Sequence, residues 1–455
     1  MNKGIDRGQL AGLPMIREDA AGIDLASEWH WVCAPRIDRS GREVTKFGGT
    51  TSQVMAMAAW LKERGVRTVA MESTGVYWIA PHEILERQGL EVLLVDTRQL
   101  AKVPGRDKKS DPTDCEWLQR LHSCGLLKGS FRPAEAICML RTLVRDKSNL
   151  VAERGDWIRR IQKSLDQMNV RVHRAVSDID GATGMAILRA IAAGERDPQE
   201  LAKLRDRRCR KSEEEIAEQL RGHWREDHLF TLQQGLKMYE SIEERIAEYD
   251  REIKRMLKSM EHPDTKGTEP PALNNANKAK AIRKRGQEPV RGALYRMAGV
   301  DLTTIDAIGA ETAEVVLSEY GTDLERFPTE HEFVSHLKLC PYRPTSGGKP
   351  LAKKKRRNSA TTRVAAALRM AATSLRNSET ALGAYYRQIA RCKGGDVAVF
   401  ATARRLAVLI YRLLRWGQQY VDEGVQEFEK RYEQKRIARL RTNANELGFE
   451  LTAKA

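Results

Sequence analysis

Apolar and basic residues recur every three or four positions between residues 137 and 172, and this spacing constrains the fold more than any other feature. Such a repeat, of about 3.5 residues, is typical of packed α-helices and incompatible with the two-residue period of a strand. It predicts one long helix. The eleven positions are Ile137, Leu140, Val144, Lys147, Val151, Arg154, Ile158, Ile161, Leu165, Met168 and Val172.

A second stretch, residues 229–256, has a similar repeat and is expected to return beside the first helix. Two such helices pair either as a hairpin within one chain or as a coiled coil between two chains, and the spacing leaves both open. The segment between them is expected to form a small helical cap. Its basic cluster is explained equally well by a solvated face and consists of Arg205, Arg207, Arg208, Arg210 and Lys211.

The first 130 residues instead alternate strand and helix patterns. Strands are predicted at 21–25, 29–37, 43–47, 66–71 and 91–95, and helices at 51–64, 77–88 and 112–124. Three strands joined by short turns, followed by helix-crossed strands, are the order of the RNase H and RuvC-like fold. A doubly wound nucleotide-binding sheet would begin strand, helix, strand with a glycine-rich turn, which this sequence lacks.

The predicted fold class is therefore an α/β RuvC/RNase H-like N-terminal domain, a long helical coiled-coil hairpin and a mostly α C-terminal domain. Pro263, Gly267, Pro270 and Pro271 indicate a linker or exposed loop. Gly299 and Gly309 suit either a phosphate-binding helix-hairpin-helix turn or ordinary helix caps. The expected segments are a flexible tail over 1–19, the RuvC-like domain over 20–130, the coiled-coil region with its basic cap over 131–260, the linker over 261–290, the C-terminal domain over 291–390, and helices with a charged tail over 391–455.

Four carboxylates near the predicted sheet indicate a metal site. Asp24 interrupts the apolar run 21–26, and a carboxylate inside a buried strand is costly unless a cation or several donors satisfy it. Glu72 ends a second apolar run, and Asp111 and Asp114 are spaced to share one face of a helix. Neighbouring carboxylates repel one another unless a divalent cation lies between them, and oxygen ligands suit Mg²⁺.

Three of these acids also have local explanations. Asp111 suits a helix N-cap before Pro112, and Asp114 suits the first turn, where it faces the helix dipole. Glu72 suits a turn residue before Ser73. Asp24, between Ile and Leu, has no comparable local explanation.

The charge of the chain points to a polyanionic partner. The sequence has 78 Lys and Arg against 62 Asp and Glu, a net charge of +16, which predicts nucleic-acid contact. Its 455 residues imply two to four domains. No apolar stretch reaches the roughly twenty residues of a membrane span, and the first residues lack a signal-peptide core, so we expect a cytosolic protein. The seven cysteines include no CxxC pair and predict neither a disulfide framework nor a zinc site.

The loop 340–349 forms a second chemical centre. Two prolines precede Ser346 and two glycines follow it, so its hydroxyl is expected on an exposed turn among cations that can hold a phosphodiester. An ordinary loop before a basic strip is the alternative, and Ser346 has no adjacent His or Asp to act as a base. The predicted nucleic-acid contacts are Arg343, Lys349, Lys353, Lys354, Lys355, Arg356 and Arg357.

These motifs carry a family resemblance. GIDLA at 22–26, MESTGVYW at 71–78 and KSDPTD at 109–114 resemble the insertion-element transposases that have an N-terminal DEDD, RuvC-like domain and a C-terminal serine domain, the bridge-RNA-guided serine recombinases. GVDLT at 299–303, TSGGK at 345–349 and AAALRMAA at 365–372 agree with it. The resemblance runs from about residue 20 to about residue 424, except for the linker.

The resemblance implies the following functions. Asp24, Glu72, Asp111 and Asp114 would bind Mg²⁺, and Ser346 would attack DNA to form a covalent phosphoserine intermediate. The partners would be double-stranded donor and target DNA, a structured guide RNA from the element, and further copies of the chain as a dimer and a tetramer on DNA. We expect composite sites formed in trans, with the acids of one subunit meeting the serine of another.

Two rival functions stay open. The acids would activate water in a junction-resolving nuclease of RuvC type, with Ser346 structural. Alternatively, the coiled coil and basic strips would serve a non-catalytic RNA- or DNA-binding assembly factor.

Overall fold

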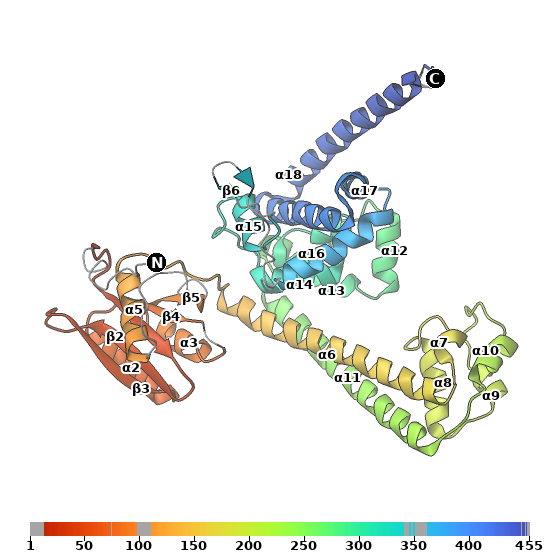
Figure 1. Ribbon diagram of the computed structural model, residues 1–455, viewed down its shortest axis with the longest axis horizontal. Helices are drawn as coiled ribbons and strands as arrows, with labels where there is room; N and C mark the ends of the chain where they lie inside the picture. The colour runs from red at the N-terminus through yellow and green to blue at the C-terminus, as the bar shows by residue number, and fades with distance from the viewer. Residues whose placement is uncertain are drawn as a thin grey trace. The chain divides into compact units, whose positions relative to one another are not determined.

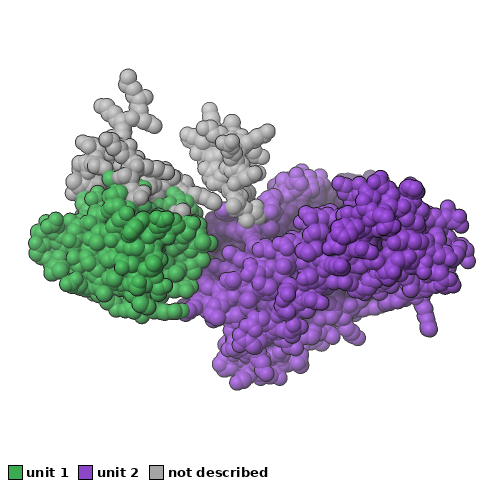
Figure 2. Space-filling model, turned by 90° about the horizontal axis from the view of Figure 1, so that it is seen from below, with its two compact units in different colours: residues 1–132 green, residues 133–455 purple. Residues whose placement is uncertain are grey.

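The computed structural model describes residues 13–73, 75–97, 111–340, 345–346, 349–350, 362–446, 448–450 and 452. Only the backbone is described at 111, 345–346 and 349–350, and at 418–433, 435–436, 439 and 443. The chain forms two compact units, residues 1–132 and 133–455 (Figure 2).

The first unit contains a mixed five-stranded sheet in the order β3-β2-β1-β4-β5 (Figure 1). β1 pairs antiparallel with β2, and β2 with β3, whereas β4 lies parallel to β1 and β5 parallel to β4. All five predicted strands and the opening antiparallel meander are confirmed. The strands are β1 (Ala20–Leu25), β2 (Trp29–Pro35), β3 (Arg42–Gly48), β4 (Thr68–Glu72) and β5 (Glu91–Val95).

Helices cover both faces of this sheet because the buried strands are apolar on both. α2 (Thr51–Glu63) and α3 (Ile79–Arg87) pack on the face that carries Ile23 and Met71. α5 (Asp111–Ser123) packs on the opposite face, where Leu118 and Leu121 join Ala70. The three predicted helices are confirmed, and the sheet lies between two helical layers.

The second unit begins with a helical hairpin of α6 (Glu135–Gln167) and α11 (Glu226–Ser259) (Figure 1). The two repeats thus pair within one chain. The first repeat was expected to continue to Val172, but α6 ends at Gln167 because Asn169 has a φ of 57°. Val172 begins a new helix, α7 (Val172–Ala175).

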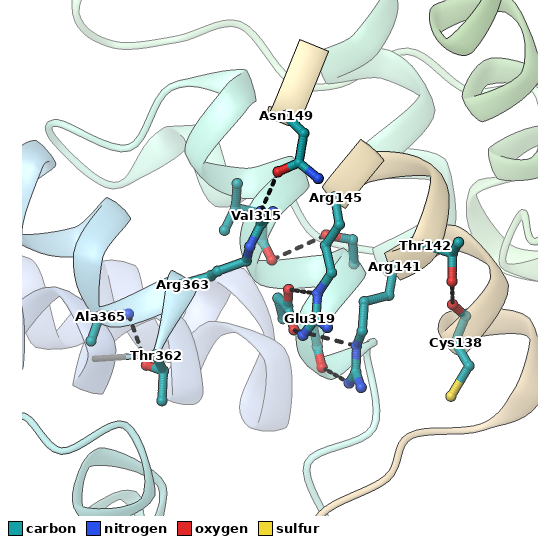
Figure 3. Close-up of polar contacts among 11 residues, drawn as sticks. Cys138, Arg141, Thr142, Arg145, Asn149, Val315, Glu319, Thr362, Arg363 and Ala365 are labelled. Atoms are coloured by element: carbon teal, nitrogen blue, oxygen red, sulfur yellow. Dashed lines mark hydrogen bonds and ion pairs between the residues drawn. The ribbon is translucent and has the colours of Figure 1, made fainter. Parts of the chain in front are cut away.

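Two basic positions of the first repeat are explained by ion pairs. Lys147 Nζ lies 2.8 Å from Glu314 Oε2 and 3.1 Å from Asp250 Oδ1, and Arg154 pairs with Glu243 of α11. Arg141 and Arg145 contact Glu319 of α14 (Ala310–Tyr320), as Figure 3 shows. These contacts join the hairpin to the C-terminal helices.

A cap closes the far end of the hairpin. Besides α7 it contains α8 (Ala182–Ala193), α9 (Pro198–Lys203) and α10 (Glu213–Leu220). Its apolar residues share one core with the adjoining turns of α6 and α11. The predicted helical cap is therefore present.

The segment expected to be a linker contains regular structure. It forms η1 (Pro263–Thr265) and α12 (Ala276–Lys284) and then enters α13 (Glu288–Ala298). Asn275 caps α12, and Ile282 buries its side chain. Gly299 is the left-handed C-cap of α13 and Gly309 the N-cap of α14, as in ordinary helix ends.

The remaining elements form a mostly helical body. Phe333 and Tyr411 lie in its aromatic core, and a non-helical Gly417 interrupts the last helix. Within the described ranges, no helix combines the length and apolar character that a membrane span requires. The elements are η2 (Leu302–Thr304), α14, α15 (Glu330–His336), β6 (Thr345–Ser346), β7 (Lys349–Pro350), α16 (Arg363–Ser374), η3 (Leu375–Asn377), α17 (Ala381–Lys393) and α18 (Gly395–Glu446).

Candidate active site

Asp24 and Glu72 lie at the same level of two neighbouring parallel strands. β1 and β4 are in register from Ala20 opposite Thr68 to Ile23 opposite Met71, so Asp24 and Glu72 are the next residues along. Parallel strands lie about 4.8 Å apart. The two carboxylates therefore start from adjacent backbone positions at the carboxyl end of the sheet.

Both acids are on the face of the sheet that α5 covers. Gly22 faces α5 so closely that an added Cβ would lie 2.5 Å from the carbonyl oxygen of Cys115. Ala70 packs on the same helix. Because strand side chains alternate between faces, Asp24 and Glu72, two residues further on, share this face with Gly22 and Ala70.

The direction of α5 brings its first turn to the same end. Gln119 Nε2 donates a 3.0 Å hydrogen bond to the carbonyl of Ala20, whereas Cys115 lies over Gly22. The helix therefore runs antiparallel to β1, and its N-terminal residues, Asp111 and Asp114, lie toward the end of the strand that carries Asp24.

The pKa of the Cys115 thiol is consistent with this placement. Burial raises this pKa, and nearby negative charges, including that of Asp24, raise it further. Cys115 follows Asp114 directly. Asp24 thus acts electrostatically on the first turns of α5, where two of the four predicted ligands lie.

The described residues of this site supply oxygen ligands suitable for Mg²⁺, but their side chains are not yet gathered into a complete coordination sphere. Asp24, Glu72 and Asp114 are each partly exposed, and carboxylate oxygens are the ligands that this cation prefers. In the described ranges, no group of three or more His, Cys, Asp or Glu side chains is placed to hold a metal ion. The side chain of Asp111 lies outside those ranges.

Ser346 belongs to the second compact unit. β6 and β7 pair antiparallel, and Ser346 lies directly opposite Lys349. Gly347 and Gly348 separate the two residues in the sequence. The side chains of both residues lie outside the described part of the chain. So do the remaining predicted nucleic-acid contacts, Arg343, Lys353, Lys354, Lys355, Arg356 and Arg357.

A cavity of about 630 Å³ lies beside Cys340, the residue at which the chain enters this loop. One face of α18 lines it, including Phe400, Arg404 and Arg405. Burial lowers the pKa of Arg405, and the charge of Arg412 lowers it further. Arg404 and Arg405 were not predicted from the sequence as candidate site residues, although they share one helical face with Val397 and Val408.

Two parts of the chain match known families of transposases. Residues 21–170 match the DEDD domain of IS110 transposases, which places the chain among the transposases. Residues 300–387 match a second model, described as Transposase IS116/IS110/IS902 family. The two matches together span more than half of the chain, which belongs to the IS116/IS110/IS902 family of transposases.

The chain is also similar to an uncharacterised 44.8 kDa protein of insertion element IS116 from Streptomyces clavuligerus. The two are 25% identical over 171 residues, which is 37% of this chain and 43% of that protein. The matched stretch thus spans less than half of the relative.

Proposed function

We propose that this protein is a cytoplasmic DNA transposase that exchanges strands between donor and target DNA through a phosphoserine intermediate on Ser346. The observation that carries the proposal is the placement of Asp24 and Glu72 on adjacent parallel strands, under the helix that begins with Asp111 and Asp114. The two family matches, each containing one of the two motifs, support it.

In the proposed reaction the Ser346 hydroxyl oxygen attacks the phosphorus of a DNA phosphodiester. An Oγ–P bond forms, a P–O bond to the leaving sugar oxygen breaks, and the proton lost by serine neutralises that oxygen. Attack by a second strand reverses these changes, so the strands reseal without a high-energy cofactor. Arg343 and Lys349 would hold the non-bridging oxygens.

The four carboxylates would hold Mg²⁺, which supplies Lewis acidity toward the phosphate and the attacking oxygen. The acids and the serine belong to different compact units. We propose that composite sites form in trans within a dimer and a tetramer on DNA. A structured guide RNA from the element would choose the DNA sites by base pairing, leaving the protein to bind backbone shape and charge.

The covalent intermediate provides the test. Wild-type protein incubated with donor and target DNA and the element's RNA should yield a denaturation-resistant protein–DNA adduct that Ser346→Ala abolishes. Ser335→Ala, an exposed serine on α15, is the matched control and should keep the adduct. Cleavage by Ser346→Ala without an adduct would instead establish the nuclease of RuvC type.

A mixing experiment tests assembly in trans. Asp24→Ala and Ser346→Ala should each be inactive, and their mixture should recover strand exchange. No recovery above either variant alone removes the support for composite sites. Full function of Asp24→Ala would favour the non-catalytic assembly factor.

A further inference from the structure

The cap at the end of the hairpin contains a cavity that the proposed chemistry does not use. The first family match ends at residue 170 and the second begins at residue 300, so the cap lies outside both. α6 has 33 residues, which is about 50 Å of helix between the cap and the end of the hairpin that contacts Glu319.

The cavity has a volume of about 760 Å³, and nine of its fourteen lining residues are polar or charged. It lies between α7 with the loop after it, the first turn of α8 and residues 206–211. A volume of this size accommodates a small-molecule-sized group. The charged residues that line it are His173, Arg174, Asp178, Asp206, Arg208, Arg210 and Lys211.

Two of these charges neutralise each other. Asp206 Oδ1 accepts 2.9 Å hydrogen bonds from the backbone N and the Nε of Arg208, and Oδ2 accepts a 3.2 Å bond from Nη2. These bonds lower the pKa of Asp206 to about 2. The ion pair is complete by itself and leaves other cations to determine what the cavity binds.

Three cations in the cavity have no acidic partner. Arg174 and Arg210 make no ion pair or side-chain hydrogen bond with any residue that the structure describes. Lys211 donates to the backbone carbonyl of Arg174, which leaves its charge uncompensated. Against these three, Asp178 is the remaining carboxylate among the lining residues, and its side chain likewise has no partner in the described ranges.

The loop that carries two of the cations is anchored at both ends. Thr183, on the first turn of α8, accepts a 3.0 Å hydrogen bond at its Oγ1 from the backbone N of Asp206. Arg205 pairs with Glu213 at 3.2 Å and donates to the carbonyl of Lys211, and Ser212 begins α10 with a capping box. These bonds fix the backbone of the loop beside the cavity, so Arg210 and Lys211 both start from its rim.

We propose that this cavity, which we name the cap site, binds the sugar–phosphate backbone of RNA. Arg174, Arg210 and Lys211 would neutralise phosphates, as cations do throughout nucleic-acid recognition. Asp178 would only repel the phosphates of DNA, but it can accept a hydrogen bond from a ribose 2′-hydroxyl, which DNA lacks. The combination of three cations with one carboxylate accordingly favours RNA.

The cap site adds a binding contact remote from Ser346 and does not depend on chemistry there. We would measure binding of the full chain, in EDTA, to a fluorescein-labelled RNA stem-loop and to a DNA stem-loop of the same sequence. Replacing Arg174, Arg210 and Lys211 together by alanine should weaken RNA binding about tenfold or more. It should also reduce the salt slope by about 2 to 3, at roughly 0.7 per phosphate contact in a single strand and 0.9 in a duplex.

The matched control removes the same charge from exposed positions of α11: Arg251→Ala, Lys254→Ala and Lys258→Ala together. This control should change RNA affinity less than threefold. Equal losses in the two triple variants would show only an effect of net charge and would overturn the proposal.

Asp178→Ala tests the choice of RNA. It should lower the ratio of RNA to DNA affinity, because DNA binding improves as RNA binding loses its hydrogen bond. A rise of equal size for both stem-loops would overturn the assignment to RNA. Ser346→Ala should bind the RNA like wild type, so a failure of the proposed catalysis would leave this result unaffected.

Discussion

Arg145 donates two hydrogen bonds to Glu319, from Nε to Oε1 at 2.8 Å and from Nη2 to Oε2 at 2.7 Å. The pair joins α6 to α14 across 174 positions of sequence. These bonds raise the pKa of Arg145. Arg141 contacts the same carboxylate, which is largely buried. The hairpin is thus fixed to the helical body by a desolvated charge cluster.

Glu319→Ala should destabilise the second unit strongly. Removing one partner of a buried ion pair leaves the other charges uncompensated and costs about 3 kcal/mol. The free energy of unfolding, measured by urea denaturation followed by circular dichroism, should fall by that order. Glu252→Ala removes an exposed pair with Arg255 on α11 and should leave the urea midpoint unchanged. Similar midpoints for the two variants would contradict a stabilising role of the cluster.

Gly22→Ala should separate α5 from the sheet. An added Cβ would lie 2.5 Å from the Cys115 carbonyl oxygen, and a backbone atom cannot rotate away. Overpacking of this kind costs about 2 kcal/mol. It should also move the first turn of α5 away from Asp24, so strand exchange should fall further than stability alone explains. Comparing exchange with the unfolded fraction at one temperature measures this.

Gly48→Ala is the control on the same sheet. Its Cβ would meet the side chain of Gln53 at 3.2 Å, and a flexible side chain can move. We expect stability and exchange close to wild type. If Gly22→Ala behaves in the same way, close packing of α5 on β1 is unimportant for the site.

Much of the candidate site around Asp24 and Glu72 was predictable, because the positions of these residues follow from strand alternation and helix spacing within short segments. Asp24 and Glu72 were identified from their place in apolar runs, and the sheet puts them in register. The close approach at Gly22 was not predictable, since it depends on which helix crosses the strand. Arg174 and Arg210 are far apart in sequence and line one cavity only because α7, α8 and the loop between α9 and α10 pack together.

His122 should make the first unit sensitive to acid. Burial lowers its pKa from 6.5 to about 4, and the charge of Arg17 lowers it further; its Nε2 lies 2.9 Å from Thr68 Oγ1. The unfolded chain therefore binds a proton below pH 6.5 that the folded unit excludes until about pH 4. Protonation of His122 in the unfolded chain should lower the free energy of unfolding by about 3 kcal/mol across this interval.

His122→Gln removes the titration and keeps a hydrogen-bonding group beside Thr68. Five of the eight tryptophans belong to residues 1–132, so urea denaturation followed by fluorescence reports chiefly on this unit. Between pH 6.5 and 4 the variant should lose less stability than wild type. His331→Gln, an exposed histidine on α15, should follow the wild-type curve. Identical pH dependence for all three proteins would contradict the assignment to His122.

Mg²⁺ should stabilise the first unit by relieving repulsion between Asp24 and its acidic neighbours. A ligand whose free concentration is a hundred times its Kd raises the free energy of unfolding by about 2.7 kcal/mol. Asp24→Asn removes one ligand and one repelling charge. Without metal it should unfold at a higher temperature than wild type, and with Mg²⁺ it should gain less. Glu63→Gln, an exposed acid on α2, should gain as much as wild type. An equal gain for Asp24→Asn and wild type would show that Asp24 is not a ligand.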